Sequence, residues 1–200
     1  MFPLGSVLLP QGVLPLHVFE PRYRAMMAAL DPELPEFGVV LIERGSEVGG
    51  GDVRSRLGTV ARVVERAELP DGRWVLIAVG TVVFEVAAWL PDDPYPQAEL
   101  VERSEPAWDA ADLDGLGQAE QMVRRSLAMA AELGESAPAA TFDLGGGPSE
   151  RLWQLAALAP LGPSDRQQLL AASDPAERLL VLSRLVGELN EVLAFRLSGG

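Results

Sequence analysis

Residues 2–30, FPLGSVLLPQGVLPLHVFEPRYRAMMAAL, decide the fold of this chain. Val7–Leu9 is an apolar run that Pro10-Gln11-Gly12 stops, and it predicts a short strand. From Leu14 to Phe19, apolar residues alternate with other residues at the period of a second strand. Pro15 cannot donate to a central ladder, so this second strand is expected at a sheet edge or at a bulge.

A helix start follows directly. Glu20-Pro21 puts proline at the first helical position, where its missing N–H costs nothing, and a carboxylate beside the positive end of the helix dipole. The spacing of the next apolar side chains predicts a helix over 21–30 with one buried face, formed by Tyr23, Met26, Met27 and Leu30.

The clearest hairpin lies further along. Two strand-like runs, Thr59–Glu68 and Arg73–Val79, flank Pro70-Asp71-Gly72. This tripeptide supplies a preset φ, a turn residue that bonds its own backbone and a left-handed position, in that order. The two runs are therefore expected to pair as antiparallel neighbours.

The remaining strands are predicted from apolar runs. Val39–Ile42 indicates a central strand, and Gly45–Asp52 a flexible connection after it. The long apolar stretch Trp74–Leu90 contains glycine and glutamate, so it predicts two strands, of which Val82–Ala88 is the second. Gln97–Arg103 adds one more.

Composition then shifts toward alanine, leucine, glutamate and arginine, after a linker near 104–114. Apolar residues at three- and four-residue spacing predict helices. We expect an α+β chain with two parts, a β-rich part over 1–103 and a helical bundle over 104–200. The predicted helices run over 116–133, 149–159, 164–172 and 175–196.

Two of these helices carry capping signals at their starts. Ser164 with Gln167 marks one, and Asp174 with Pro175 and Glu177 marks the last helix. Each pattern places a side-chain acceptor where the first backbone N–H groups of a helix need one.

The charged residues limit the chemistry. All sixteen basic residues are arginine, and cysteine is absent. A phosphate-binding P-loop needs its lysine, and thiol chemistry and cysteine-ligated metal sites need cysteine. The formal net charge of −13 is spread over both halves. It argues against nucleic acid, whose binding depends on phosphate neutralisation.

His17 is the only histidine, and with Glu20 it could form an acid–base pair or part of a metal site. No second histidine completes a zinc site, and no Gly-x-Ser-x-Gly elbow supplies a nucleophile. We interpret His17 as structural and predict no catalytic residue, no metal and no cofactor. A small hydrolase that uses His17 and Glu20 is the alternative.

Several motifs together resemble the N-terminal domain of Lon protease, also called the Lon substrate-binding domain. The opening carries Phe-Pro-Leu-Gly, Leu-Pro-x-Gly and Leu-Pro-Leu-His-x-Phe-Glu-Pro-Arg-Tyr-Arg. Val83 departs from the pattern, since the family usually has arginine there. The likeness spans nearly the whole chain, with further matches at 37–40, 57–61, 69–73, 79–80, 161–170 and 173–179.

The resemblance implies a fold and an activity. The fold is a PUA-like β pseudo-barrel with one helix, followed by an α-helical bundle. The activity is recognition of exposed hydrophobic stretches in client proteins, without nucleotide. The Lon peptidase uses a Ser-Lys dyad and its ATPase a P-loop lysine, so a chain without lysine holds neither. We expect a non-catalytic binding protein whose partners are unfolded or hydrophobic polypeptide segments and, for delivery, a separate protease.

The candidate peptide-binding residues follow the second strand. Arg22 and Arg24 could hold an acidic partner or stack on a peptide, or they could pair with Glu20 or Asp31. Methionine side chains refit to different partners, which suits a binding surface, but they also suit a core. The candidate set is Phe19, Arg22, Tyr23, Met26 and Met27.

PUA-like folds also occur in RNA-binding modules, which is a third alternative that the acidic composition opposes. No uninterrupted apolar run has the length of a membrane span, and the N-terminus lacks the charged start of a signal peptide. We therefore expect a cytoplasmic protein with no nucleic-acid and no membrane partner.

Overall fold

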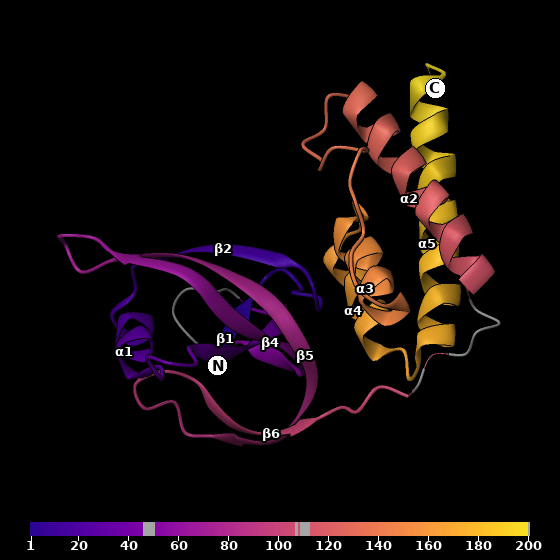
Figure 1. The fold of residues 1–200 in the computed structure, drawn as a ribbon. Coiled ribbons are helices and arrows are strands. Elements are labelled where there is room, and N and C mark those ends of the chain that lie inside the picture. Colours follow the sequence, from indigo (N-terminus) through magenta and orange to yellow (C-terminus); the bar gives the residue numbers. More distant parts are fainter. Residues whose placement is uncertain (46–50, 107, 109–112, 200) are drawn as a thin grey trace. The chain divides into compact units, whose positions relative to one another are not determined.

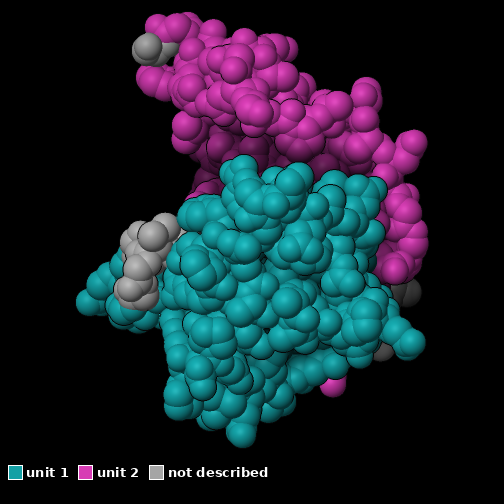
Figure 2. Space-filling model, turned by 90° about the vertical axis from the view of Figure 1, so that its left-hand side faces the viewer, with its two compact units in different colours: residues 1–103 teal, residues 104–200 magenta. Residues whose placement is uncertain are grey.

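The computed structural model describes residues 1–200 except 46–50, 107, 109–112 and 200, and only the backbone of Leu113. The described chain divides into two compact units, Met1–Arg103 (unit 1) and Ser104–Gly200 (unit 2), which are coloured separately in Figure 2. That each unit folds as a separate domain stays a prediction.

Unit 1 combines one six-stranded sheet with one helix among its described residues (Figure 1). The strand order is β1-β3-β4-β5-β2, and β6 also pairs with β5. The β1–β3 pair is parallel, and the other pairs are antiparallel. The elements are β1 (Phe2–Leu4), β2 (Val13–Val18), α1 (Pro21–Ala29), β3 (Glu36–Arg44), β4 (Val53–Glu68), β5 (Trp74–Leu90) and β6 (Gln97–Glu102).

The hairpin between β4 and β5 is confirmed. Glu68 pairs with Trp74 across the turn, and Gly72 takes a left-handed φ of 78°. The Gly72 N–H donates to the Leu69 carbonyl at 2.8 Å, and the Asp71 carboxylate accepts from the Arg73 N–H at 3.1 Å. The turn chemistry read from the sequence therefore sets this register.

β5 is one strand of 17 residues, and the prediction of two strands divided near Gly80 is wrong. The Gly80 N–H donates to the Gly12 carbonyl at 2.9 Å, and its carbonyl accepts from Gln11 at 2.8 Å. A Cβ at position 80 would collide with the carbonyl oxygen of Leu9. The glycine thus permits a close crossing of two backbones within a continuing strand.

The first strand is also placed differently from the prediction. β1 is Phe2–Leu4 and pairs with Val39–Leu41 of β3, whereas Val7–Leu9 is buried without being a strand. The Thr59 hydroxyl donates to the Leu8 carbonyl at 2.7 Å. The apolar run at 7–9 is therefore buried, as its composition predicts. Its Leu8 carbonyl bonds to a side chain of β4, however, and not to the backbone of a neighbouring strand.

The helix α1 is confirmed, with Pro21 in its first turn. Its buried side chains pack on the sheet in one apolar cluster, and a smaller cluster lies around Phe84. Each fully buried large apolar side chain contributes about 1.5–3 kcal/mol relative to an exposed one. The main cluster includes Phe2, Tyr23, Met26, Met27, Phe37 and Leu76.

Unit 2 contains the four predicted helices, each within three residues of its predicted bounds. α2 packs along α5, where the Ser126 hydroxyl lies 2.8 Å from Oδ1 of Asn190. The capping signal at Ser164 is wrong, because α4 begins one residue earlier behind Gly162. The helices are α2 (Leu113–Glu132), α3 (Pro148–Leu158), α4 (Pro163–Ala171) and α5 (Pro175–Leu197).

The capping signal at Asp174 is confirmed, since its carboxylate accepts from the Glu177 N–H at 2.8 Å. We expect Asp174→Ala to lower the melting temperature by about 2–4 °C, because one backbone donor of α5 loses its acceptor. Asp174→Asn keeps an acceptor oxygen and should melt near the wild type. Equal melting of all three proteins would contradict this role of Asp174.

Candidate functional site

The end of β2 and the start of α1 form a corner with a small hollow of about 100 Å³. Residues of β1 also line it, so the two strands at the ends of the path β1-β3-β4-β5-β2 both reach it. The lining is mainly apolar: Phe2, Leu4, Leu16, His17, Val18, Phe19, Glu20 and Tyr23. Four residues that the sequence singled out, at positions 17, 19, 20 and 23, therefore meet in one place.

β2 is an edge strand, as the proline within it predicts. It pairs with β5 on one side only, among the described strands. The Gly80 N–H donates to Gly12, and hydrogen-bonded positions alternate along an antiparallel ladder. The backbone groups of Leu14 and Leu16 thus face β5, and those of Val13, Pro15 and His17 face the open edge. Pro15 occupies a position where the ladder needs no N–H.

Three of the five candidate binding residues are core residues. Tyr23, Met26 and Met27 are each 2–3% exposed. The Tyr23 ring stacks on Phe2 with 4.1 Å between centroids, and burial raises the pKa of Tyr23 to about 12. The apolar face of a short helix packs inward, so Met26 and Met27 lie in the core, whereas Tyr23 is buried but also lines the hollow.

Arg22 pairs with Glu20, one of the two partners that the sequence suggested. The Arg22 Nε lies 3.1 Å from a carboxylate oxygen of Glu20, and the guanidinium lies 4.6 Å from the centre of the Tyr23 ring. Both charged side chains keep about a fifth of their surface exposed. Asp31 instead accepts from the backbone of Glu33 at 2.8 Å. The ion pair between Arg22 and Glu20 therefore places two charged side chains beside the apolar hollow.

Phe19 remains a surface residue, with 55% of its area exposed. Its ring meets His17 edge-on, with 6.2 Å between centroids. Two further apolar side chains are exposed on β2 and β5, Val13 at 66% and Val75 at 45%. No pattern in the sequence singles out these two valines, and only the β2–β5 pairing puts Val75 beside His17.

His17 is exposed and has Glu20 as its nearest acidic neighbour in the lining of the hollow. Within the described residues, no group of three histidine or acidic side chains could hold a metal ion. The carboxylate of Glu20 is bonded to Arg22. Among the described residues that line the hollow, none is serine, threonine or cysteine.

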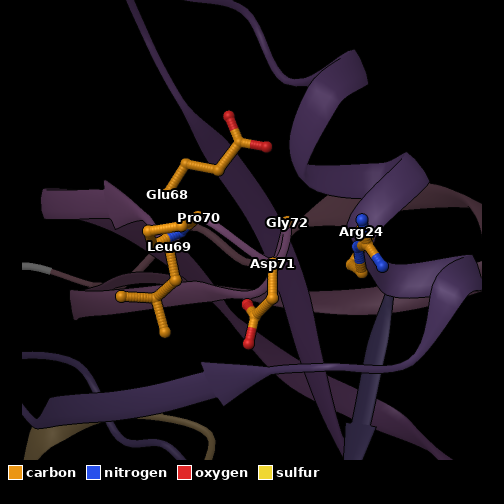
Figure 3. A pocket seen from close by; sticks show the side chains of 6 residues that line it. All are labelled: Arg24, Glu68, Leu69, Pro70, Asp71 and Gly72. Carbon is orange, nitrogen blue, oxygen red and sulfur yellow. The ribbon is translucent and has the colours of Figure 1, made fainter.

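A second, shallow hollow lies over the β4–β5 turn (Figure 3). Arg24 of α1 reaches over Gly72 there, instead of pairing with Glu20 or Asp31. The Asp71 carboxylate in its lining is bonded to Arg73 at 2.7 Å. Charged and turn residues dominate this hollow, so it offers less apolar surface than the corner between β2 and α1.

No described helix has both the length and the apolar content that a membrane crossing requires. Val83, where relatives are expected to carry arginine, lies within β5 and is partly buried. Its carbonyl accepts from the Arg103 N–H at 2.9 Å, at the end of unit 1. The position therefore makes a backbone contact here that does not depend on its side chain.

The chain belongs to the family of the ATP-dependent protease La (LON) substrate-binding domain, whose model matches residues 1–187. It is similar to the Lon protease of Trichlorobacter lovleyi, with 26% identity over 97% of this chain, and to that of Roseiflexus castenholzii, with 27% over 96%. In each case it spans 24% of the length of the relative. The likeness therefore concerns one part of those proteases.

Two solved structures share the fold. One is a Lon N-terminal domain protein from Xanthomonas campestris, with 28% identity, a TM-score of 0.64 and coverage of 92% of this chain and 95% of that one. The other is the N-terminal domain of the Mycobacterium avium complex Lon protease, with 17% identity, a TM-score of 0.65 and coverage of 92% and 96%. The mixed α+β fold is thus that of a Lon N-terminal domain.

Proposed function

We propose that this protein recognises other polypeptides, and that it binds unfolded or hydrophobic segments without nucleotide and without catalysing a reaction. Membership in the substrate-binding family carries the proposal. The corner between β2 and α1 supports it physically, because an apolar hollow, exposed Phe19 and an open strand edge lie together there. Exposed apolar surface of this kind is typical of an interaction site.

Phe19 and Arg22 are the members of the candidate set that stay in the proposed surface. Tyr23, Met26 and Met27 support it from behind, as the packed layer on which α1 rests. We further propose that unit 1 is a PUA-like pseudo-barrel and that the helices of unit 2 form a bundle. The shared hollow of β1 and β2 supports the first of these, since only a curled sheet brings its two edges together.

The absence of lysine supports a role in recognition alone. Neither the Ser-Lys peptidase chemistry nor a P-loop is available to this sequence. Delivery of clients to a separate protease in the cytoplasm is the role that we propose for such a protein. A surface that accepts many clients cannot be preorganised for one of them, so we expect a dissociation constant on the order of micromolar.

A titration tests the proposed function. A fluorescently labelled, permanently unfolded protein is titrated with the wild type in buffer without nucleotide. We expect saturable binding that changes little between low and high salt, because apolar contact dominates. The folded form of the same labelled protein is the matched control and should bind at least about tenfold more weakly. Equal binding of both forms, or no binding, would contradict the proposal.

A further inference from the structure

We infer that the open edge of β2 takes up a client segment as an added strand, and that the hollow beside it accepts one aliphatic side chain of that segment. The inference rests on the proposed function, which supplies the occupant, an extended stretch of another polypeptide. It adds where the segment lies, how its backbone is held and which side chains it prefers.

The backbone of β2 offers hydrogen-bonding groups that can hold the segment. The N–H groups of Val13 and His17 and the carbonyls of Val13, Pro15 and His17 face away from β5, as the Gly12–Gly80 bond determines. No described strand pairs with them. A strand edge of this kind binds an extended peptide through main-chain hydrogen bonds, which hold any sequence equally. Such a mode suits a protein whose clients differ in sequence.

The hollow determines which side chains the segment prefers. Alternate side chains of an added strand point to the same side, so one of them can enter the hollow. Leu16 and Val18 on the inward side of β2 line the hollow together with Leu4 of β1. An apolar cavity of about 150 Å³ holds a benzene ring. The hollow has about 100 Å³, so its size matches a leucine or valine side chain better than an aromatic ring.

The flanking surface makes a client a better occupant than a second copy of this chain. Phe19 and Val13 stand exposed at the two ends of β2, and they can cover apolar residues of a segment that extends beyond the strand. If β2 paired with β2 of another copy, both paired edges would lack the N–H at Pro15, so the ladder between them would miss hydrogen bonds. Dimer formation through this edge is therefore an outcome that the experiment must detect.

The test uses two variants of one residue. His17→Pro removes an outward N–H from β2, whereas His17→Ala removes the ring and keeps that N–H. The ratio of their dissociation constants for the unfolded protein isolates the main-chain bond. We expect His17→Pro to bind at least about threefold more weakly than His17→Ala. Equal binding by the two variants, with wild-type binding intact, would overturn the added strand and leave the proposed function standing.

Labelled ten-residue peptides, rich in threonine with one variable central residue, complete the test. We expect the leucine peptide to bind at least about threefold more tightly than the tryptophan peptide, and backbone N-methylation at alternate residues to abolish binding. The peptide measurements also test strand addition if the His17→Pro variant does not fold. A preference for tryptophan, indifference to N-methylation or a concentration-dependent dimer that His17→Pro abolishes would overturn the inference. Failure of the wild type to bind even the unfolded protein would instead overturn the proposed function.

Discussion

Tyr23→Asp is expected to destabilise unit 1 by about 4 kcal/mol or more, enough to leave a large fraction unfolded at 37 °C. The side chain is 3% exposed, so a carboxylate there would be charged without a partner or would have to bind a proton. The substitution also removes the stacking on Phe2 at 4.1 Å. Chemical denaturation followed by circular dichroism measures the loss.

Tyr23→Phe is the matched control, because it keeps the ring and removes only the hydroxyl. It should stay within about 1 kcal/mol of the wild type. A Tyr23→Asp protein with the wild-type denaturation midpoint would place this side chain on the surface. That result would return Tyr23 to the candidate binding surface and contradict the packing of α1.

Arg178→Met is expected to lower the unfolding free energy of unit 2 by about 2–3 kcal/mol, because a buried guanidinium loses its hydrogen bonds and its packing. The guanidinium is 4% exposed and lies 3.7 Å from the centre of the Trp153 ring. It donates to the Leu169 carbonyl at 3.2 Å and also to Glu105. Removing the arginine leaves that carboxylate with the Ser149 hydroxyl and the Trp153 indole N–H as its neutral donors. Urea denaturation gives the difference in unfolding free energy.

Two further variants separate the causes of that loss. Arg184→Met removes an exposed arginine from the same helix and should change stability by less than about 0.5 kcal/mol. The double variant Glu105→Gln with Arg178→Met should be about as stable as Arg178→Met, because the exposed Glu105 side chain is solvated and keeps its neutral donors. A single Arg178→Met variant as stable as Arg184→Met would contradict the contribution of the buried Arg178 side chain.

Local patterns in the sequence predict the elements whose causes are local. The alternation in β2, the turn at Pro70-Asp71-Gly72 and the cap at Asp174 each depend on residues within a few positions of one another, and each is confirmed. The edge position of β2 follows from one missing N–H at Pro15. These features needed no knowledge of which segments meet in space.

Features that depend on distant contacts were missed or predicted differently. β1 has three residues and exists because it pairs with β3 almost forty residues later. Gly80 resembles a strand breaker until the crossing of Leu9 is known. Arg178 resembles one more charged residue on a helix, since its partner Glu105 lies 73 residues away. Pairing across such separations leaves no local pattern in a single sequence.

The candidate site also combines features with local causes and features that depend on distant contacts. The residues of the motif from His17 to Tyr23 meet at the corner that we propose for binding, because one strand end and one helix start are adjacent in the chain. The sequence could not assign the inward face of α1 to the core rather than to a surface, since both uses need apolar residues at helical spacing. Val75 entered the site only through the register of β2 on β5.

A comparison of two phenylalanine variants tests whether this protein binds unfolded polypeptides at the corner between β2 and α1. Phe19 and Phe195 are 55% and 66% exposed; Phe19 lines the corner of unit 1, and Phe195 belongs to α5 of unit 2. We would titrate the labelled unfolded protein with Phe19→Asp and with Phe195→Asp, after showing that both melt near the wild type. The account predicts at least about fivefold weaker binding for Phe19→Asp and wild-type binding for Phe195→Asp. Equal binding by both variants, or weaker binding by Phe195→Asp alone, would contradict it.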